Sequence, residues 1–295
     1  MMIEFYLESK DATGKITKSQ EIITFPSFVK ELSFAGINSK LNPLDNCFRI
    51  LTTIFEFAPS FFDKQFHIHP ELQNDPTEKA HFSNKVGRAF SVYLAKKICG
   101  AKYVYSYECV LKYKGYKISV DRPDYYCNTT KQFFSLEAKG YSSNSFSDKK
   151  MQDVKAQANS GPLQKSFSIA SATFNIYKSP KVKFYDPDGD SLNYDQDFAD
   201  LLRKNYYSEV LRILNSSFFT LLKETEKEAN DFYVYAPFVG SDFFKILVHK
   251  SIVENKDLKE EIPVFETEDK FIDSDGIGLA LNLEEIFKQM NKNKI

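Results

Sequence analysis

Three charged residues in two neighbouring predicted strands have types and spacing that suit phosphate chemistry. Residues 122–141 read RPDYYCNTTKQFFSLEAKGY, in which Asp124 follows a proline, and Glu137 and Lys139 come later with one small residue between them. Side chains alternate between the two faces of a strand, so Glu137 and Lys139 project side by side. If their strand pairs with the preceding one as a hairpin, Asp124 lies beside Glu137.

Two carboxylates held this close repel each other unless a cation lies between them. Ligands that are all oxygen suit Mg²⁺, and the metal could stabilise the charge that develops on a phosphate. The ammonium of Lys139 could orient or activate a water. The pattern therefore indicates a metal site for cutting phosphodiester bonds, and the alternative is an ordinary pair of surface strands that carry charges.

The elements that must position these residues are indicated by caps and apolar periodicity. Residues 83–99 predict a helix that begins after Ser83 or Asn84 as N-cap and stops at Gly100. Aromatic and β-branched residues then predict two strands joined by a tight turn, a third strand, a helix that opens at Asp148, and a further pair of strands. These segments are 103–113, 116–126, 131–140, 149–160, 164–177 and 181–190.

This order of helix, three strands, helix and strand, with Pro-Asp on the second strand and Glu-x-Lys on the third, resembles the restriction endonuclease-like nucleases, the PD-(D/E)XK superfamily. The resemblance covers residues 83 to 185, about a third of the chain. It implies that Asp124 and Glu137 bind Mg²⁺, with Mn²⁺ able to substitute, and that the main-chain carbonyl of Ala138 is a further ligand. It also implies that Lys139 positions the attacking water during hydrolysis of DNA.

Four further residues are candidates for an accessory role. Many members of the superfamily carry an acidic residue on the helix before the first strand, but residues 83–98 contain no Asp or Glu. The nearest candidates are Glu78, ahead of that helix, and Glu108, in the next predicted strand. Gln157 and Lys155 on the following helix could face the site, where a lysine could hold a phosphate; the alternative for both is the helix surface.

Composition limits the classes of protein that the chain can belong to. It has 295 residues with 42% hydrophobic and 27% charged, and its 28 Phe and 17 Tyr without any Trp predict a core built from benzene rings. The formal net charge of −1 argues against nonspecific coating of nucleic acid. Residues 131–183 nevertheless hold nine Lys against three acidic residues, which indicates either a confined phosphate-facing surface or a solvated lysine-rich face.

Several absences indicate where the protein works. The four Cys residues show no CxxC pair and no zinc or disulfide spacing, which predicts free thiols in a reducing compartment. The first residues, MMIEFYLESKD, lack a basic region followed by an apolar run, and no stretch of about 18 apolar residues occurs. We therefore expect a cytoplasmic protein outside the membrane.

Some motifs have plain structural interpretations. His67 and His69 in FHIHP lack a third ligand at a suitable spacing and are interpreted as a structural pair. DPDGD at 186–190 and DSDG at 273–276 begin like calcium loops but are interpreted as turns. No GxxxxGK[ST] loop exists for nucleotide hydrolysis.

The sequence predicts an α/β fold with a mixed central sheet flanked by helices. We expect an N-terminal accessory region over 1–82, the nuclease core over 83–190 and a mostly helical region over 191–295. The leading functional hypothesis is a Mg²⁺-dependent endonuclease that cleaves foreign DNA in restriction or antiphage defence, as a homodimer or with a partner protein. The alternative is a noncatalytic nucleic-acid or protein-binding module that keeps the same fold.

Overall fold

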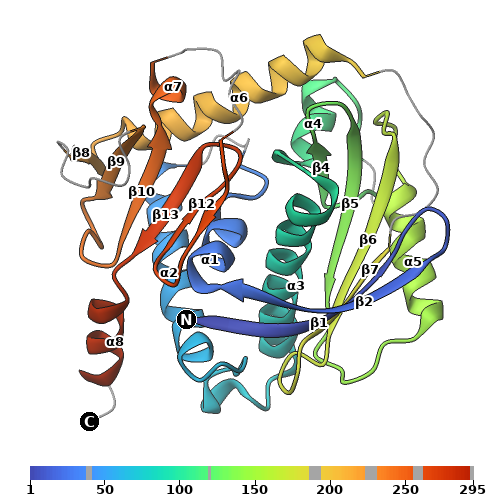
Figure 1. Cartoon of the computed structure of the whole chain (residues 1–295), viewed down its shortest axis with the longest axis horizontal. Helices are drawn as coiled ribbons and strands as arrows, with labels where there is room; N and C mark the ends of the chain where they lie inside the picture. Colours follow the sequence, from blue (N-terminus) through green and yellow to red (C-terminus); the bar gives the residue numbers. More distant parts are fainter. Residues whose placement is uncertain (38–41, 119–120, 186–193, 223–230, 255–261, 293–295) are drawn as a thin grey trace.

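The computed structural model describes residues 1–37, 42–118, 121–185, 194–222, 231–254 and 262–292. Its main feature is a seven-stranded mixed sheet in the order β2-β1-β7-β6-β5-β4-β3 (Figure 1). Helices cover both faces of this sheet, which confirms the predicted fold class. The strands are β1 (Met2–Lys10), β2 (Ile16–Thr24), β3 (Tyr103–Ser106), β4 (Tyr125–Asn128), β5 (Phe133–Gly140), β6 (Phe167–Phe174) and β7 (Lys181–Tyr185).

The half of the sheet that carries the candidate residues follows the predicted order. It consists of α3 (Pro76–Cys99), the antiparallel strands β3, β4 and β5, then α5 (Asp148–Asn159) and β6. Strand β6 runs parallel to β5 because α5 carries the chain back along the sheet. Ser171 of β6 bonds to Ser91 of α3, whereas Ala170 and Ala172 pack with α5, so the two helices lie on opposite faces.

Helix α3 begins earlier than the sequence predicts. Asp75, rather than Ser83, is its N-cap, because the Asp75 carboxylate accepts the N–H groups of Thr77 (2.7 Å) and Glu78 (3.3 Å). Ser83 is buried in the middle of the helix. Glu78 therefore lies within the first turn of α3 and not ahead of it.

The first two predicted strands are shorter than expected. Only Tyr103–Ser106 is a strand, and α4 (Tyr107–Tyr113) follows it, because Tyr107, Val110 and Leu111 are buried at helical and not alternating spacing. Strand β4 begins at Tyr125, so Asp124 directly precedes the strand that pairs with β5 instead of ending one.

The N-terminal region contributes to the same sheet and core. Strand β1 pairs in parallel with β7 and antiparallel with β2. Helices α1 (Phe25–Phe34) and α2 (Pro43–Phe62) pack beside α3, and the 3₁₀ turn η1 (Pro70–Leu72) leads into it. Phenylalanine rings fill the space between them: the ring of Phe28 lies 4.7 Å from that of Phe57 and 5.2 Å from that of Phe61, centroid to centroid. This confirms the expected aromatic core.

The C-terminal region departs from the mostly helical structure that the sequence predicts. Besides α6 (Gln196–Leu214), α7 (Lys250–Val253) and α8 (Leu283–Lys292), it contains a six-stranded antiparallel sheet in the order β11-β12-β13-β10-β9-β8. Each strand has six residues or fewer, too short for a clear local signal. They are β8 (Phe219–Leu222), β9 (Phe232–Pro237), β10 (Phe244–His249), β11 (Phe265–Glu266), β12 (Lys270–Ile272) and β13 (Ile277–Leu281).

Helix α3 and strand β5 meet backbone to backbone at two glycines. A Cβ atom on Gly140 would lie 1.7 Å from the carbonyl oxygen of Ser83, and one on Gly87 would lie 2.6 Å from that of Lys139. No side chain fits between the two elements at this point. The contact places the neighbours of these glycines, Arg88 and Lys139, at fixed positions relative to each other.

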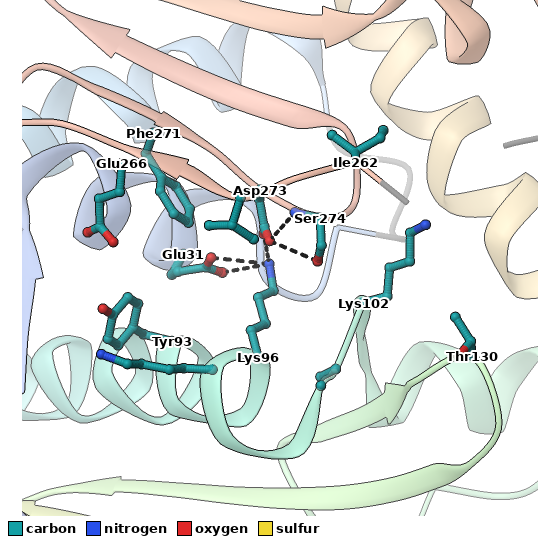
Figure 2. A pocket seen from close by; sticks show the side chains of 14 residues that line it. Glu31, Tyr93, Lys96, Lys102, Thr130, Ile262, Glu266, Phe271, Asp273 and Ser274 are labelled. Atoms are coloured by element: carbon teal, nitrogen blue, oxygen red, sulfur yellow. Dashed lines mark hydrogen bonds and ion pairs between the residues drawn. The ribbon is translucent and has the colours of Figure 1, made fainter. Parts of the chain in front are cut away.

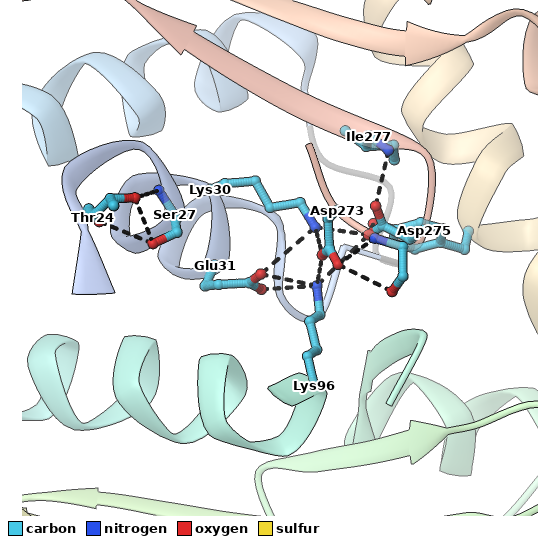
Figure 3. Close-up of polar contacts among 10 residues, drawn as sticks. Thr24, Ser27, Lys30, Glu31, Lys96, Asp273, Asp275 and Ile277 are labelled. Atoms are coloured by element: carbon cyan, nitrogen blue, oxygen red, sulfur yellow. Dashed lines mark hydrogen bonds and ion pairs between the residues drawn. The ribbon is translucent and has the colours of Figure 1, made fainter. Parts of the chain in front are cut away.

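Five charged side chains, four of them buried and Lys96 partly exposed, join the N-terminal helices to the C-terminal sheet (Figure 3). We call this set the lysine–carboxylate cluster: it comprises Lys30 and Glu31 of α1, Lys96 of α3, and Asp273 and Asp275 of the β12–β13 turn. Lys30 Nζ lies 2.8 Å from Asp275 Oδ2, Lys96 Nζ lies 2.9 Å from Glu31 Oε2, and both ammoniums contact Asp273 Oδ2. The cluster therefore fixes the C-terminal sheet to α1 and α3.

The remaining sequence interpretations have plain outcomes. DSDG is a turn, closed by the bond from Gly276 N–H to the carbonyl of Asp273 (2.9 Å), whereas DPDGD at 186–190 lies outside the described residues. All four cysteines are free. None of the described helices is long and apolar enough to cross a bilayer.

Candidate active site

The register of β4 against β5 brings the two predicted carboxylates together. Tyr125 pairs with Leu136, so the residues next to them, Asp124 and Glu137, face each other across the ladder. Glu137 Oε2 accepts the N–H of Asp124 (3.1 Å), and Asp124 Oδ2 accepts the N–H of Ala138 (3.0 Å). Each carboxylate is thus held by the backbone of the opposite strand.

Lys139 completes the group that the sequence predicts. Its ammonium forms an ion pair with Glu137 Oε1, an atom that is buried and accepts no hydrogen bond from the described residues. Glu137 is 0% exposed, whereas Asp124 is exposed and the Lys139 side chain is 33% exposed. The site therefore has a buried carboxylate at its base with an exposed carboxylate and an ammonium above it.

The proton affinities of the site follow from this burial. Burial raises the pKa of Glu137 to about 7, the charge of Asp124 adds to the rise, and Lys139 opposes it. Burial alone would lower the pKa of Lys139, but its bond and ion pair with Glu137 outweigh that effect, so its pKa lies above the ordinary value. At neutral pH Lys139 is therefore a charged ammonium.

A polar pocket of about 460 Å³ opens beside Asp124. Its walls come from five parts of the chain: the end of α1, helix α2, helix α3, the segment from β3 to β4, and helix α5. The N–H of Gly36 donates to the carbonyl of Val104 (3.1 Å), which brings the end of α1 to this edge of the sheet. The lining residues are Ala35, Gly36, Arg49, Arg88, Ser106, Glu108, Arg122, Pro123, Asp124, Tyr125 and Gln157.

Three arginines line the pocket, and none of them is among the site residues predicted from the sequence. Arg88 Nε donates to the hydroxyl of Tyr125 (2.7 Å), Arg49 Nη2 donates to the carbonyl of Leu32 (2.8 Å), and Arg122 Nη2 bonds to Glu108 Oε2 (2.7 Å). Arg122 adjoins the Pro-Asp motif and could have been noticed there. Arg49 and Arg88 carry no local signal, because only the packing of α2 and α3 brings them here.

The structure separates the four accessory candidates. Gln157 lines the pocket, where its Nε2 donates to the carbonyl of Arg122 (3.1 Å), and Glu108 lines it from α4 and not from a strand. Lys155 does not line the pocket; its ammonium lies 5.5 Å from the ring centroid of Tyr185, because residues two apart on a helix point in different directions. Glu78 lines another cavity, between α2, α3 and α8.

The groups that could bind a metal ion where β4 and β5 meet are all oxygen atoms. Among the described residues no group of three or more His, Cys, Asp or Glu side chains could hold a metal ion. Asp124 and Glu137 with the carbonyl of Ala138 provide two carboxylates and one neutral oxygen, which fit a hard cation that keeps several waters, such as Mg²⁺. The buried Oε1 of Glu137 is the oxygen that such a cation would share with Lys139 or take over from it.

Comparison with protein-family models, with curated proteins and with solved structures gives no match for this chain. The chemistry of the site therefore rests on its own residues.

Proposed function

We propose that the protein is a metal-dependent nuclease that hydrolyses phosphodiester bonds in DNA, with its active site at Asp124, Glu137 and Lys139. The observation that carries this proposal is the β4–β5 register, which sets two carboxylates against each other with an ammonium paired to the buried one. The arginine-lined pocket beside them suits a phosphate substrate. The order α3, β3, β4, β5, α5, β6, with the short helix α4 inserted between β3 and β4, supports the resemblance to the PD-(D/E)XK superfamily.

The roles of the residues follow from burial and charge. Asp124, Glu137 and the carbonyl of Ala138 would hold Mg²⁺ or Mn²⁺, which when bound supplies positive charge to a phosphate. Lys139 is protonated at neutral pH, so it orients the attacking water and balances negative charge but does not take the proton of the water. Gln157 steadies the Pro-Asp segment through its bond to the carbonyl of Arg122.

The biological setting within this proposal is cleavage of foreign DNA, in restriction or antiphage defence. One site per chain cuts one strand at a time, so cleavage of both strands favours a homodimer or a partner protein. This setting rests on analogy with the superfamily.

A cleavage assay tests the proposal. Plasmid DNA and an RNA transcript are incubated with Mg²⁺ or Mn²⁺ and the wild type, Asp124→Ala, Lys139→Ala, or the control Lys15→Ala, which alters an exposed lysine between β1 and β2. We expect DNA cleavage by the wild type and the control alone. Equal cleavage by all four proteins would exclude this site, and cleavage of RNA alone would keep the chemistry but replace the substrate.

The second candidate function is a noncatalytic binding module. The ion pair between Lys139 and Glu137 favours it, because it gives the buried carboxylate a partner without any metal. Tight DNA binding with no cleavage in Mg²⁺ or Mn²⁺, unchanged in Asp124→Ala, is the result that this alternative predicts.

A further inference from the structure

Two guanidinium groups line the pocket without an ion pair to any carboxylate of the described residues. Arg49 of α2 and Arg88 of α3 are both half-buried and line the same polar space. Burial lowers the pKa of Arg49, and the charge of Arg88 lowers it further, which shows that the two cations lie within range of each other. Neither forms an ion pair with any residue that the structure describes.

The lysine–carboxylate cluster shows how this chain neutralises two other cations. In the lysine–carboxylate cluster, Lys30 and Lys96 are surrounded by three carboxylates (Figure 3). The neighbouring pocket of about 520 Å³, which is drawn in Figure 2, shows Lys96 bonded to Glu31 and Asp273 on its wall. Burying a cation is costly unless a negative charge accompanies it. The arginine pair forms no such ion pair with the described residues, although the charge of Asp124, at the same pocket, acts on Arg88 and raises its pKa.

The hydrogen bonds of the pair hold it in place without neutralising it. Arg49 donates to a backbone carbonyl and Arg88 to a tyrosine hydroxyl, one bond from each guanidinium to the described residues. A guanidinium has five N–H donors, so most of them remain for a ligand. The charged ligand that matches planar N–H donors best is a phosphate.

We propose that Arg49 and Arg88 form a seat for a substrate phosphate next to the one that is cleaved. This inference rests on the proposed function, because Asp124, at the same pocket, belongs to the cleavage site. The seat selects a nucleic-acid strand with at least two phosphates in succession over a lone phosphodiester. It needs no metal, since its charge comes from the two side chains.

The first test is binding in EDTA, where no cleavage occurs. Anisotropy of a 5′-fluorescein 12-nucleotide single-stranded DNA is titrated with the full chain of the wild type, Arg49→Gln, Arg88→Gln and the control Lys15→Gln, which alters an exposed lysine outside the pocket. We expect each arginine variant to bind about tenfold or more weakly, the loss expected for a hydrogen bond to a charged group, and the control to bind as the wild type. Equal binding by all four proteins would overturn the seat.

The second test separates a seat from a structural arginine. Inorganic phosphate is added during thermal unfolding, and we expect a rise in Tm for the wild type that is absent from Arg49→Gln and Arg88→Gln. Without phosphate, Arg49→Gln loses its bond to the Leu32 carbonyl as well as the like-charge contact, so the Tm of each protein with phosphate is compared with its own Tm without phosphate. A Tm lowered without phosphate, together with an unchanged response to phosphate, would overturn the proposal.

The two proposals fail in different ways. Asp124→Ala should abolish cleavage and keep the Tm rise with phosphate, because the seat lies on the arginines. A phosphate response that depends on Arg49 and Arg88 in a protein without cleavage would keep the seat and remove the nuclease. Cleavage that depends on Asp124 but not on the arginines would keep the nuclease and remove the seat.

Discussion

Glu137 is the residue on which the site depends most, because it is buried and touches every other member. Its Oε2 holds the backbone of Asp124, and its Oε1 meets Lys139. Burial opposes its ionised form, and the ion pair with Lys139 only partly offsets that effect, as its raised pKa shows. A carboxylate that stays buried despite the free-energy cost of desolvating its charge is typical of functional sites.

We expect Glu137→Gln to abolish cleavage without destabilising the fold. The amide oxygen of Gln still accepts the N–H of Asp124, and the cost of burying a charge disappears. The free energy of unfolding, measured in urea, should equal or exceed that of the wild type, while cleavage falls about 10²-fold or more. Retained cleavage, or a large loss of stability, would contradict the assigned role.

Glu31 makes stability depend on pH near neutrality. Burial raises its pKa from 4.5 to about 7, with Asp273 adding to the rise and Lys30 and Lys96 opposing it. If all five groups of the lysine–carboxylate cluster are ionised, three carboxylates face two ammoniums, so a proton on Glu31 balances the charge. Tyr206 also faces the cluster, with its hydroxyl 2.8 Å from Asp275 Oδ2.

The sign of this dependence follows from proton counting. Between pH 4.5 and about 7 the folded state holds a proton on Glu31 that the unfolded state has lost, so stability falls as pH rises through this range. Relative to Glu31→Gln, the wild type should lose on the order of 1–3 kcal/mol between pH 5 and pH 8. Urea unfolding at both values measures the difference, and parallel pH profiles would refute it.

Among the elements, α3 and β5 matter most, because their glycine contact sets the spacing of Arg88 and Lys139. We expect Gly140→Ala to lower stability by about 2 kcal/mol or more and to reduce cleavage, because its Cβ meets the backbone of Ser83. Circular dichroism melts and the plasmid assay measure both effects.

The matched control for this prediction is Gly115→Ala. Unlike Gly140, Gly115 has room for a Cβ, since no atom lies within 4 Å of it, but its φ of 73° strains any other residue. It should lose about 1 kcal/mol and keep its cleavage rate. A larger loss of cleavage at Gly115 than at Gly140 would contradict the role of the contact.

Elements with local signals were predictable, and elements that depend on distant partners were not. Gly100 ended α3 as expected, and α5 ended before Gly161 and Pro162. The six-stranded sheet escaped prediction because its strands are short and gain stability only by pairing. The spacing of three residues within a stretch of 16 was enough to predict that Asp124, Glu137 and Lys139 group together. The arginine pair instead depends on the packing of α2 against α3, which no short stretch of sequence reveals.

At the scale of the whole molecule, the lysine–carboxylate cluster connects the C-terminal sheet to the helices that carry the pocket. We expect Asp273→Ala to destabilise the protein by about 3–5 kcal/mol, because it leaves two buried ammoniums short of a partner. Chemical unfolding measures this loss. The control is Glu268→Ala, whose side chain is 71% exposed and should change stability by less than about 0.5 kcal/mol.

One helix serves both the cluster and the pocket: Lys96 and Arg88 stand eight positions apart on α3. A genetic screen for alleles that have lost function would therefore return hits at Lys96 and Asp273 as well as at Asp124 and Lys139. Substitutions at Lys96 and Asp273 would reduce the amount of intact protein in the cell. Substitutions at Asp124 and Lys139 would reduce turnover per molecule. Immunoblots beside the activity readout would sort the alleles and prevent the cluster from being mistaken for a second active site.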